Sequence, residues 1–154
     1  MRKMQIAVIG DNNPPAEIIR WAEEVGRLLA QNDAVVVCGG LGGVMAAAAR
    51  GAAAAGGITV GILPTYDATT ANSSIAIAIP SGMGHGRNVM VVASGDAIIA
   101  LPGSYGTLSE VALALKLGKA VIGVQAWGDV RGVQTAHSPA EAVTLALAAA
   151  HRLS

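Results

Sequence analysis

The chain has 154 residues, which suits one domain around one hydrophobic core. Hydrophobic residues make up 53% and charged residues 13%, and this composition excludes a disordered chain. Ten basic residues balance ten acidic ones, so the chain lacks the basic surplus typical of nucleic-acid-binding proteins. The single cysteine, Cys38, excludes an intramolecular disulfide, and no apolar stretch approaches the length of a membrane span.

Apolar runs suited to buried strands alternate with helical patterns in the first half of the chain. Residues 5–9 predict a first strand and are too short for a signal peptide, so we expect a cytoplasmic protein without membrane or nucleic-acid partners. A helix opened by Pro14 and Pro15 follows. Its predicted apolar face has helical spacing and consists of Ile18, Ala22, Val25 and Leu29. Further predicted elements are a strand at 34–37, an alanine-rich helix at 44–55 and a strand at 58–62.

The second half continues the alternation. The pattern predicts strands at residues 74–79, 97–101 and 120–124 and helices at 87–93 and 107–117. The apolar face expected for the helix at 107–117 is Leu108, Val111, Ala112 and Leu115. Ser138 to Glu141 match a capping box with proline at the first helical position, which predicts a C-terminal helix. This order predicts an α/β fold with a parallel sheet, in a single domain spanning residues 1–154.

Four loops that follow predicted strands are rich in glycine or small polar residues. In a parallel sheet these loops meet at the carboxyl edge, where open α/β sheets bind ligands and helix N-termini favour phosphate. One such turn alone is more often structural, but the convergence of four predicts a site for a phosphate-bearing nucleotide or nucleotide-like ligand. The predicted ligand residues are Gly10, Asp11, Gly39, Gly40, Gly42, Gly43, Arg87, Asn88, Gly103, Ser104, Tyr105, Gly106 and Thr107.

Two common nucleotide-binding motifs are absent from the sequence. No Gly-x-Gly-x-x-Gly opens the first helix, which argues against ordinary dinucleotide binding, and no P-loop motif occurs. The histidines, His85, His137 and His151, are scattered and form no zinc pattern with Cys38, so no metal site is predicted.

Arg87 and Glu110 are the candidate reactive groups, and each has a structural alternative. The planar guanidinium of Arg87 suits phosphate, although an arginine after a flexible loop is usually solvated. Residues 103–107 are expected to wrap a phosphate at the start of a helix, and this segment is called the phosphate loop below. Glu110 lies one turn beyond it, which indicates a catalytic or ribose-binding role. However, Thr107 and Glu110 also have the spacing of a capping box. Asp11 suits a ribose or a base, and equally a plain turn before a helix.

Three segments resemble the Lonely Guy-like superfamily, whose members were long mislabelled as lysine decarboxylases. They are Gly39-Gly-Leu-Gly-Gly-Val-Met45, Gly86-Arg-Asn-Val-Met90 and Pro102-Gly-Ser-Tyr-Gly-Thr-Leu-Ser-Glu110. The resemblance implies a three-layer Rossmann-like fold with a central parallel sheet, in a homodimer or homotetramer. Enzymes of this family hydrolyse the N-glycosidic bond of AMP or cytokinin nucleotides with an arginine and a glutamate that match Arg87 and Glu110. Residues 103–107 match the loop that holds the 5′-phosphate.

One branch of this superfamily is more similar in detail. Asn88 stands where the hydrolases usually carry lysine, and Ser104 replaces the second glycine of their motif. With its short chain, Asn88 and the segment Leu108-Ser-Glu-Val-Ala-Leu-Ala-Leu-Lys-Leu-Gly-Lys119, the sequence resembles the molybdenum cofactor carrier branch, whose members bind a phosphate-bearing pterin without consuming it. This predicts a carrier of the molybdenum cofactor or of an AMP-like nucleotide, with no cofactor required for function. The alternatives are a nucleoside 5′-monophosphate phosphoribohydrolase acting through Arg87 and Glu110, and a nucleotide sensor or scaffold without turnover.

Overall fold

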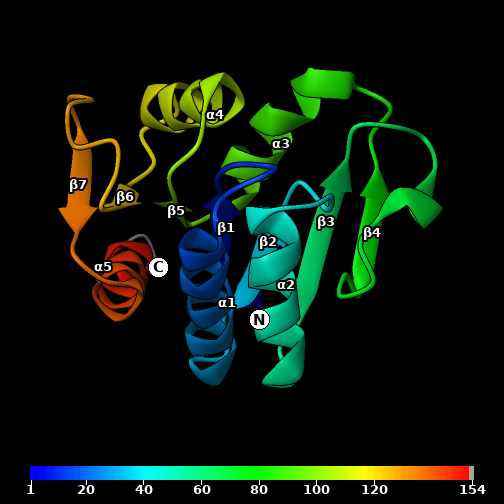
Figure 1. Ribbon diagram of the computed structural model, residues 1–154, viewed down its shortest axis with the longest axis horizontal. Coiled ribbons are helices and arrows are strands. Elements are labelled where there is room, and N and C mark those ends of the chain that lie inside the picture. Colours follow the sequence, from blue (N-terminus) through cyan, green and yellow to red (C-terminus); the bar gives the residue numbers. More distant parts are fainter. Residues whose placement is uncertain (153–154) are drawn as a thin grey trace.

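A computed structural model describes residues 1–152 and contains one sheet of seven parallel strands (Figure 1). The strand order is β4-β3-β2-β1-β5-β6-β7. The strands are β1 (Gln5–Ile9), β2 (Val35–Cys38), β3 (Thr59–Leu63), β4 (Ile77–Pro80), β5 (Ala97–Ala100), β6 (Val121–Val124) and β7 (Val133–Ala136). The helices are α1 (Ala16–Gln31), α2 (Val44–Ala54), α3 (Arg87–Ser94), α4 (Tyr105–Lys116) and α5 (Pro139–His151), with short 3-10 turns at η1 (Ala68–Thr70) and η2 (Gly84–Gly86).

Helices cover both faces of the sheet, so the molecule has three layers (Figure 1). Side chains of α1, α2 and α5 share one core cluster with alternate residues of the central strands, such as Ile6 and Val8. Side chains of α3 and α4 share a second cluster with the intervening residues, such as Ala7 and Ile9. Side chains of a strand point alternately to its two faces, so β1 contributes side chains to both core clusters. The prediction of a three-layer Rossmann-like fold with a central parallel sheet is confirmed.

The two helices with the clearest sequence signals form as expected. The predicted face of α1 is buried against the sheet. At the start of α5, the Ser138 hydroxyl accepts a hydrogen bond from the Glu141 N–H at 3.1 Å, and Pro139 occupies the first turn. The carboxylate of Glu141 in turn accepts from the His137 N–H at 2.9 Å. The predicted Ser138 cap therefore forms. Glu141 accepts from the N–H of His137, one residue before the N-cap, instead of from the Ser138 N–H of a standard capping box. No helix within residues 1–152 has the length and hydropathy needed to cross a membrane.

Two features of the sequence interpretation are corrected by the structure. Strand β7 was not predicted, because its residues form a short and mostly exposed edge strand without an apolar run. The predicted face of α4 was only partly right, because Val111 is buried and Leu115 packs against the core, whereas Leu108 and Ala112 are exposed. Thr107 and Ala114 are buried instead. Apolar residues occur all around this helix, so periodicity alone did not determine which side meets the sheet.

The strand order reverses beside β1. The chain builds outward from β1 through β2 and β3 to β4, then returns to place β5 on the other side of β1. Strand β5 pairs with β1 in register from Ile6 opposite Ala97 to Ile9 opposite Ala100. The loops that leave β1 and β5 therefore diverge above a crevice at the carboxyl edge, which is where sheets of this type bind ligands.

Candidate functional site

A pocket of about 240 Å³ lies at the crevice between the loops that follow β1, β2 and β5. The predicted site residues that line it are Gly10, Asp11, Gly39, Arg87, Asn88, Ser104, Gly106, Thr107 and Glu110. The predicted residues that do not line it are Gly40, Gly42, Gly43, Gly103 and Tyr105. The structure thus brings together the two candidate reactive groups and part of the loop that was predicted to hold phosphate.

Six lining residues were not among the predicted site residues. They are Val8, Ile9, Asn12, Leu41, Met45 and His85. Met45 begins an alanine-rich helix, so its sequence context indicated core packing. His85 lies in a glycine-rich turn that was expected at the ligand edge, and that position was the available signal. Leu41 and Met45 join Val8 and Ile9 as the apolar residues that line the pocket.

Glycine is required at two places where the loops meet. A Cβ atom at Gly39 would come within 2.7 Å of the Arg87 guanidinium and 2.6 Å of the Met45 sulfur. Gly43 has φ of +60°, and a Cβ atom there would lie 2.3 Å from the backbone oxygen of Asp11. Gly43 therefore serves loop packing, although it does not line the pocket.

Asp11 connects the loops around the pocket mainly through its backbone. Its N–H donates to the carbonyl of Pro102 at 3.1 Å, and its carbonyl accepts from the N–H of Val44 at 2.9 Å. Its carboxylate accepts from the Asn13 N–H at 3.1 Å, which is the Asx-turn geometry that the sequence left open as an alternative. The residue lines the pocket and also ties the β1, β2 and β5 loops together.

Arg87 is the first residue of α3 and is only 9% exposed. Its Nε donates to the carbonyl of Ile62 at 2.9 Å and its Nη2 to the carbonyl of Gly39 at 3.4 Å. Its Nη1 donates to the Oδ1 of Asn88, which is itself buried. Three of the five N–H donors of the guanidinium are therefore used within the protein, and two remain for a ligand. The solvated-surface alternative for Arg87 is wrong.

Glu110 projects from the second turn of α4 into the pocket wall. Burial raises the pKa of this carboxyl group from 4.5 to about 7, and the nearby positive charge of Arg87 partly opposes the shift. The charge of Glu110 therefore changes close to neutral pH. Burial also lowers the pKa of Arg87, an effect that Glu110 opposes.

The capping-box alternative for Glu110 is wrong. Helix α4 begins at Tyr105, its N-cap is Ser104, and Thr107 already lies inside the helix. The side chain of Ser104 makes no capping hydrogen bond, and the first helical bond runs from the Leu108 N–H to the Ser104 carbonyl at 2.9 Å. The N–H groups of this first turn have no partner within the helix, as the ends of α-helices leave their first donors unsatisfied, and Gly106 and Thr107 of the turn line the pocket.

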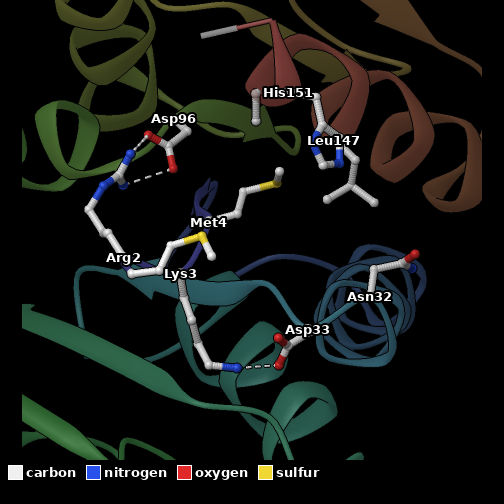
Figure 2. A pocket seen from close by; sticks show the side chains of 10 residues that line it. Arg2, Lys3, Met4, Asn32, Asp33, Asp96, Leu147 and His151 are labelled. Carbon is white, nitrogen blue, oxygen red and sulfur yellow. Dashed lines mark hydrogen bonds and ion pairs between the residues drawn. The ribbon is translucent and has the colours of Figure 1, made fainter. Parts of the chain in front are cut away.

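A larger hollow of about 480 Å³ lies at the opposite edge of the sheet, between the N-terminal segment and α5 (Figure 2). Figure 2 shows that its two basic side chains face acidic partners. Arg2 forms two hydrogen bonds with Asp96, at 2.9 and 3.0 Å, and Lys3 pairs with Asp33. These charges neutralise each other, and no glycine-rich loop opens there. The hollow therefore lacks the features of an anion site.

The described part of the chain contains no group of three or more His, Cys, Asp or Glu residues that could hold a metal ion. Cys38 lies beneath the pocket, fully buried at the end of β2. Burial raises the pKa of its thiol to about 11, so it is protonated and unreactive at neutral pH.

Solved structures with the same fold include carriers of the molybdenum cofactor. The molybdenum cofactor binding protein of Rippkaea orientalis is 36% identical, with a TM-score of 0.89, covering 96% of this chain and 98% of that chain. The molybdenum cofactor carrier protein of Chlamydomonas reinhardtii is 30% identical, with a TM-score of 0.86, covering 96% of this chain and 98% of that one.

A relative by sequence is an enzyme. The cytokinin riboside 5′-monophosphate phosphoribohydrolase of Mycobacterium tuberculosis is 34% identical over 130 residues, which are 77% of this chain and 68% of that protein. The family model described as the SLOG cluster4 family matches residues 3–151. These likenesses agree with the resemblance to the Lonely Guy-like superfamily and its molybdenum cofactor carrier branch. The chain belongs to the SLOG cluster4 family.

Proposed function

We propose that this protein binds a phosphate-bearing ligand at the carboxyl edge of the sheet and carries it without consuming it. The observation that carries the proposal is the open N-terminal turn of α4 beside the Arg87 guanidinium, in one pocket at the strand-order reversal. The N–H groups of Tyr105, Gly106 and Thr107 offer donors and the positive end of the helix dipole to a phosphate. Arg87 lines the same pocket, and its two remaining N–H groups are further donors for that phosphate.

The molybdenum cofactor is the proposed cargo, because structures 36% and 30% identical to this chain are of proteins named for binding or carrying it. The pocket volume of about 240 Å³ is below the usual range of about 300–1,000 Å³ for drug-sized ligands. This pocket would therefore not enclose the whole of a pterin with its phosphate. Partial enclosure suits a carrier, which must release its cargo intact.

The role of Asn88 also supports a carrier. Its side chain holds Nη1 of Arg87, and both residues are buried. With the carbonyls of Ile62 and Gly39 as further acceptors, the guanidinium is fixed in place before any ligand arrives. An arginine whose guanidinium is already held by three hydrogen bonds is suited to positioning an anion, because little side-chain freedom is lost on binding.

The test is a binding experiment on purified protein. Molybdenum cofactor prepared without oxygen would be mixed with the protein, passed through a gel-filtration column and quantified in the protein fraction by the fluorescence of its oxidised pterin. AMP and inorganic phosphate would be compared by calorimetry. Recovery of intact cofactor with the protein supports the carrier, and cofactor eluting only in the small-molecule fraction refutes it.

Two variants of Gly106 make the experiment specific to the phosphate. A Cβ atom at Gly106 meets nothing within 4 Å, so alanine and aspartate both fit. Aspartate suits the first turn of a helix but repels a bound phosphate, so Gly106→Asp is expected to weaken binding about tenfold or more. Gly106→Ala is the matched control and is expected to bind like the wild type. Equal binding by both variants would contradict a phosphate at this turn.

A second candidate function is hydrolysis of a nucleoside 5′-monophosphate, and Glu110 is the observation that favours it. A carboxyl group with a pKa of about 7 is suited to exchanging a proton with a reacting group at neutral pH. In this mechanism Glu110 activates water or stabilises charge on the ribose, while Arg87 orients the substrate. Incubation with AMP and chromatography for free adenine tests it. Adenine release that Glu110→Gln abolishes would support the enzyme, and no release by folded protein would exclude AMP as its substrate.

We also propose that the protein works as a homodimer or homotetramer in the cytoplasm. Apolar side chains are exposed on the side of the sheet that α3 and α4 cover, among them Val89 at 42% and Leu108 at 36%. On the edge strand β4, Ile77 is 49% exposed. Such side chains gain stability when a second copy covers them. Light scattering on the eluting protein would give a mass of two or four chains, and a mass of one chain would contradict this proposal.

A further inference from the structure

The loop between β6 and β7 has an unusual backbone. Among residues 1–152, Asp33, Gln125 and Trp127 are the non-glycine residues with positive φ, and two of them lie in this loop. Gln125 has φ of 49° and Trp127 has φ of 64°. The left-handed region is unfavourable for a bulky side chain, and such strain persists only where surrounding structure enforces it.

Hydrogen bonds hold this strained loop in place. The Gln125 N–H donates to the Ala136 carbonyl at 2.9 Å, and its side-chain Nε2 donates to the His137 carbonyl at 2.8 Å. The Trp127 carbonyl accepts from the Val130 N–H at 3.0 Å. These bonds attach the loop to the C-terminal end of β7 and fix the direction of the Trp127 ring.

That direction is towards the phosphate loop. The indole Nε1 of Trp127 donates to the carbonyl of Leu101 at 2.9 Å, and the ring packs against the core cluster beneath α3 and α4. Leu101 is the fully buried residue that follows β5 and precedes the loop into α4. Its N–H donates to the Ile9 carbonyl at 2.9 Å, and the next carbonyl, of Pro102, accepts from Asp11.

The entry to the phosphate loop is thus held from two sides. On the β1 side the contacts are backbone to backbone, whereas on the β6 side the contact is the indole of Trp127. Trp127 does not line the pocket, so any influence on a ligand passes through Leu101 and the start of α4. A hydrogen bond to Leu101, the first residue after β5, fixes the direction in which the chain leaves the sheet.

We propose that Trp127 is a positioning residue, which holds the β5–α4 loop so that the first turn of α4 points at the ligand phosphate. The part of this inference that concerns ligand binding rests on the proposed function. Its structural part, the restraint of residues 101–107, holds for the unliganded protein. The strain at Gln125 and Trp127 is then the cost of directing an indole N–H at the base of the site.

The test compares two tryptophan variants. Trp127→Phe keeps an aromatic ring and removes the N–H, while Trp21→Phe on α1, outside the pocket, controls for the loss of a tryptophan. Hydrogen exchange would be measured by mass spectrometry on the peptide covering residues 101–107, and affinity for AMP by calorimetry. Trp127→Phe is expected to exchange faster in this peptide and to bind AMP about tenfold more weakly, because a net hydrogen bond corresponds to about that factor. Trp21→Phe should do neither.

Each outcome decides a separate question. Wild-type exchange and affinity in Trp127→Phe would overturn the inference while leaving the proposed function intact. If the wild type binds neither AMP, inorganic phosphate nor the molybdenum cofactor, the proposed function fails, and the exchange data alone decide whether Trp127 restrains the loop. If Trp127→Phe does not fold, the Trp21→Phe protein has Trp127 as its single tryptophan. Its fluorescence anisotropy should then show an indole that does not rotate independently of the protein, and a freely rotating indole would overturn the inference.

Discussion

Replacing Glu110 with glutamine removes a carboxyl group whose burial makes its charge costly. The native pKa is about 7, against 4.5 for the free group, so between these two values the native state holds a proton that the unfolded state has released. Stability contributed by this group therefore falls as pH rises from about 4.5 to about 7, and the full cost is present above that window. Glutamine has nearly the same shape as the protonated acid and has no charge at any pH.

The expected magnitude follows from the pKa shift. One pKa unit corresponds to about 1.4 kcal/mol, and water reaching the pocket reduces the effective value, so the carboxylate costs about 2–3 kcal/mol at pH 8. For a chain of this length, Glu110→Gln should raise the melting temperature by roughly 5–10 °C at pH 8. At pH 4.5 the two proteins should melt at nearly the same temperature, because the native acid is then neutral.

Calorimetric melts of both proteins between pH 4.5 and 8.5 provide the measurement. Glu17→Gln, at an exposed position in the first turn of α1, is the control and should not show a growing stabilisation with pH. The reasoning would be refuted if Glu110→Gln were destabilised at pH 8, since that result would mean that the carboxylate is stabilised by its surroundings rather than penalised by burial.

Three further variants or treatments test other parts of the structure. Arg87→Lys cannot reproduce the fork that bonds Ile62, Gly39 and Asn88, so we expect a loss of about 2–3 kcal/mol in urea unfolding and loss of phosphate binding; unchanged stability would contradict the observed bonds. Cys38 should not react with a thiol reagent at pH 8 in the native protein and should react at once in denaturant, because burial raises its pKa to about 11; rapid native labelling would contradict this. Ser138→Ala removes the cap of α5 and should cost about 1 kcal/mol, whereas Ser138→Asp, which retains a cap acceptor, should cost much less.

Local patterns in the sequence were sufficient for most elements. The face of α1 followed from helical spacing because its other positions are polar, and the start of α5 followed from a capping box and a proline. Strand β7 gave no such signal, since an exposed edge strand needs no apolar run. For α4, an apolar surface on all sides left the buried face undetermined until α4 was packed against the sheet.

In the candidate site, too, some features followed from the sequence and others only from the tertiary structure. The sequence by itself determined that loops rich in glycine or small polar residues follow β1, β2, β4 and β5, and parallel strands require these loops to meet at one edge. The tertiary structure alone decided that Met45 lines the pocket, and that Trp127 donates a hydrogen bond to Leu101, between β5 and α4. It also decided that Glu110 titrates near neutral pH. The physical reason is that burial and contacts between distant segments set these properties, and neither is encoded in the spacing of neighbouring residues.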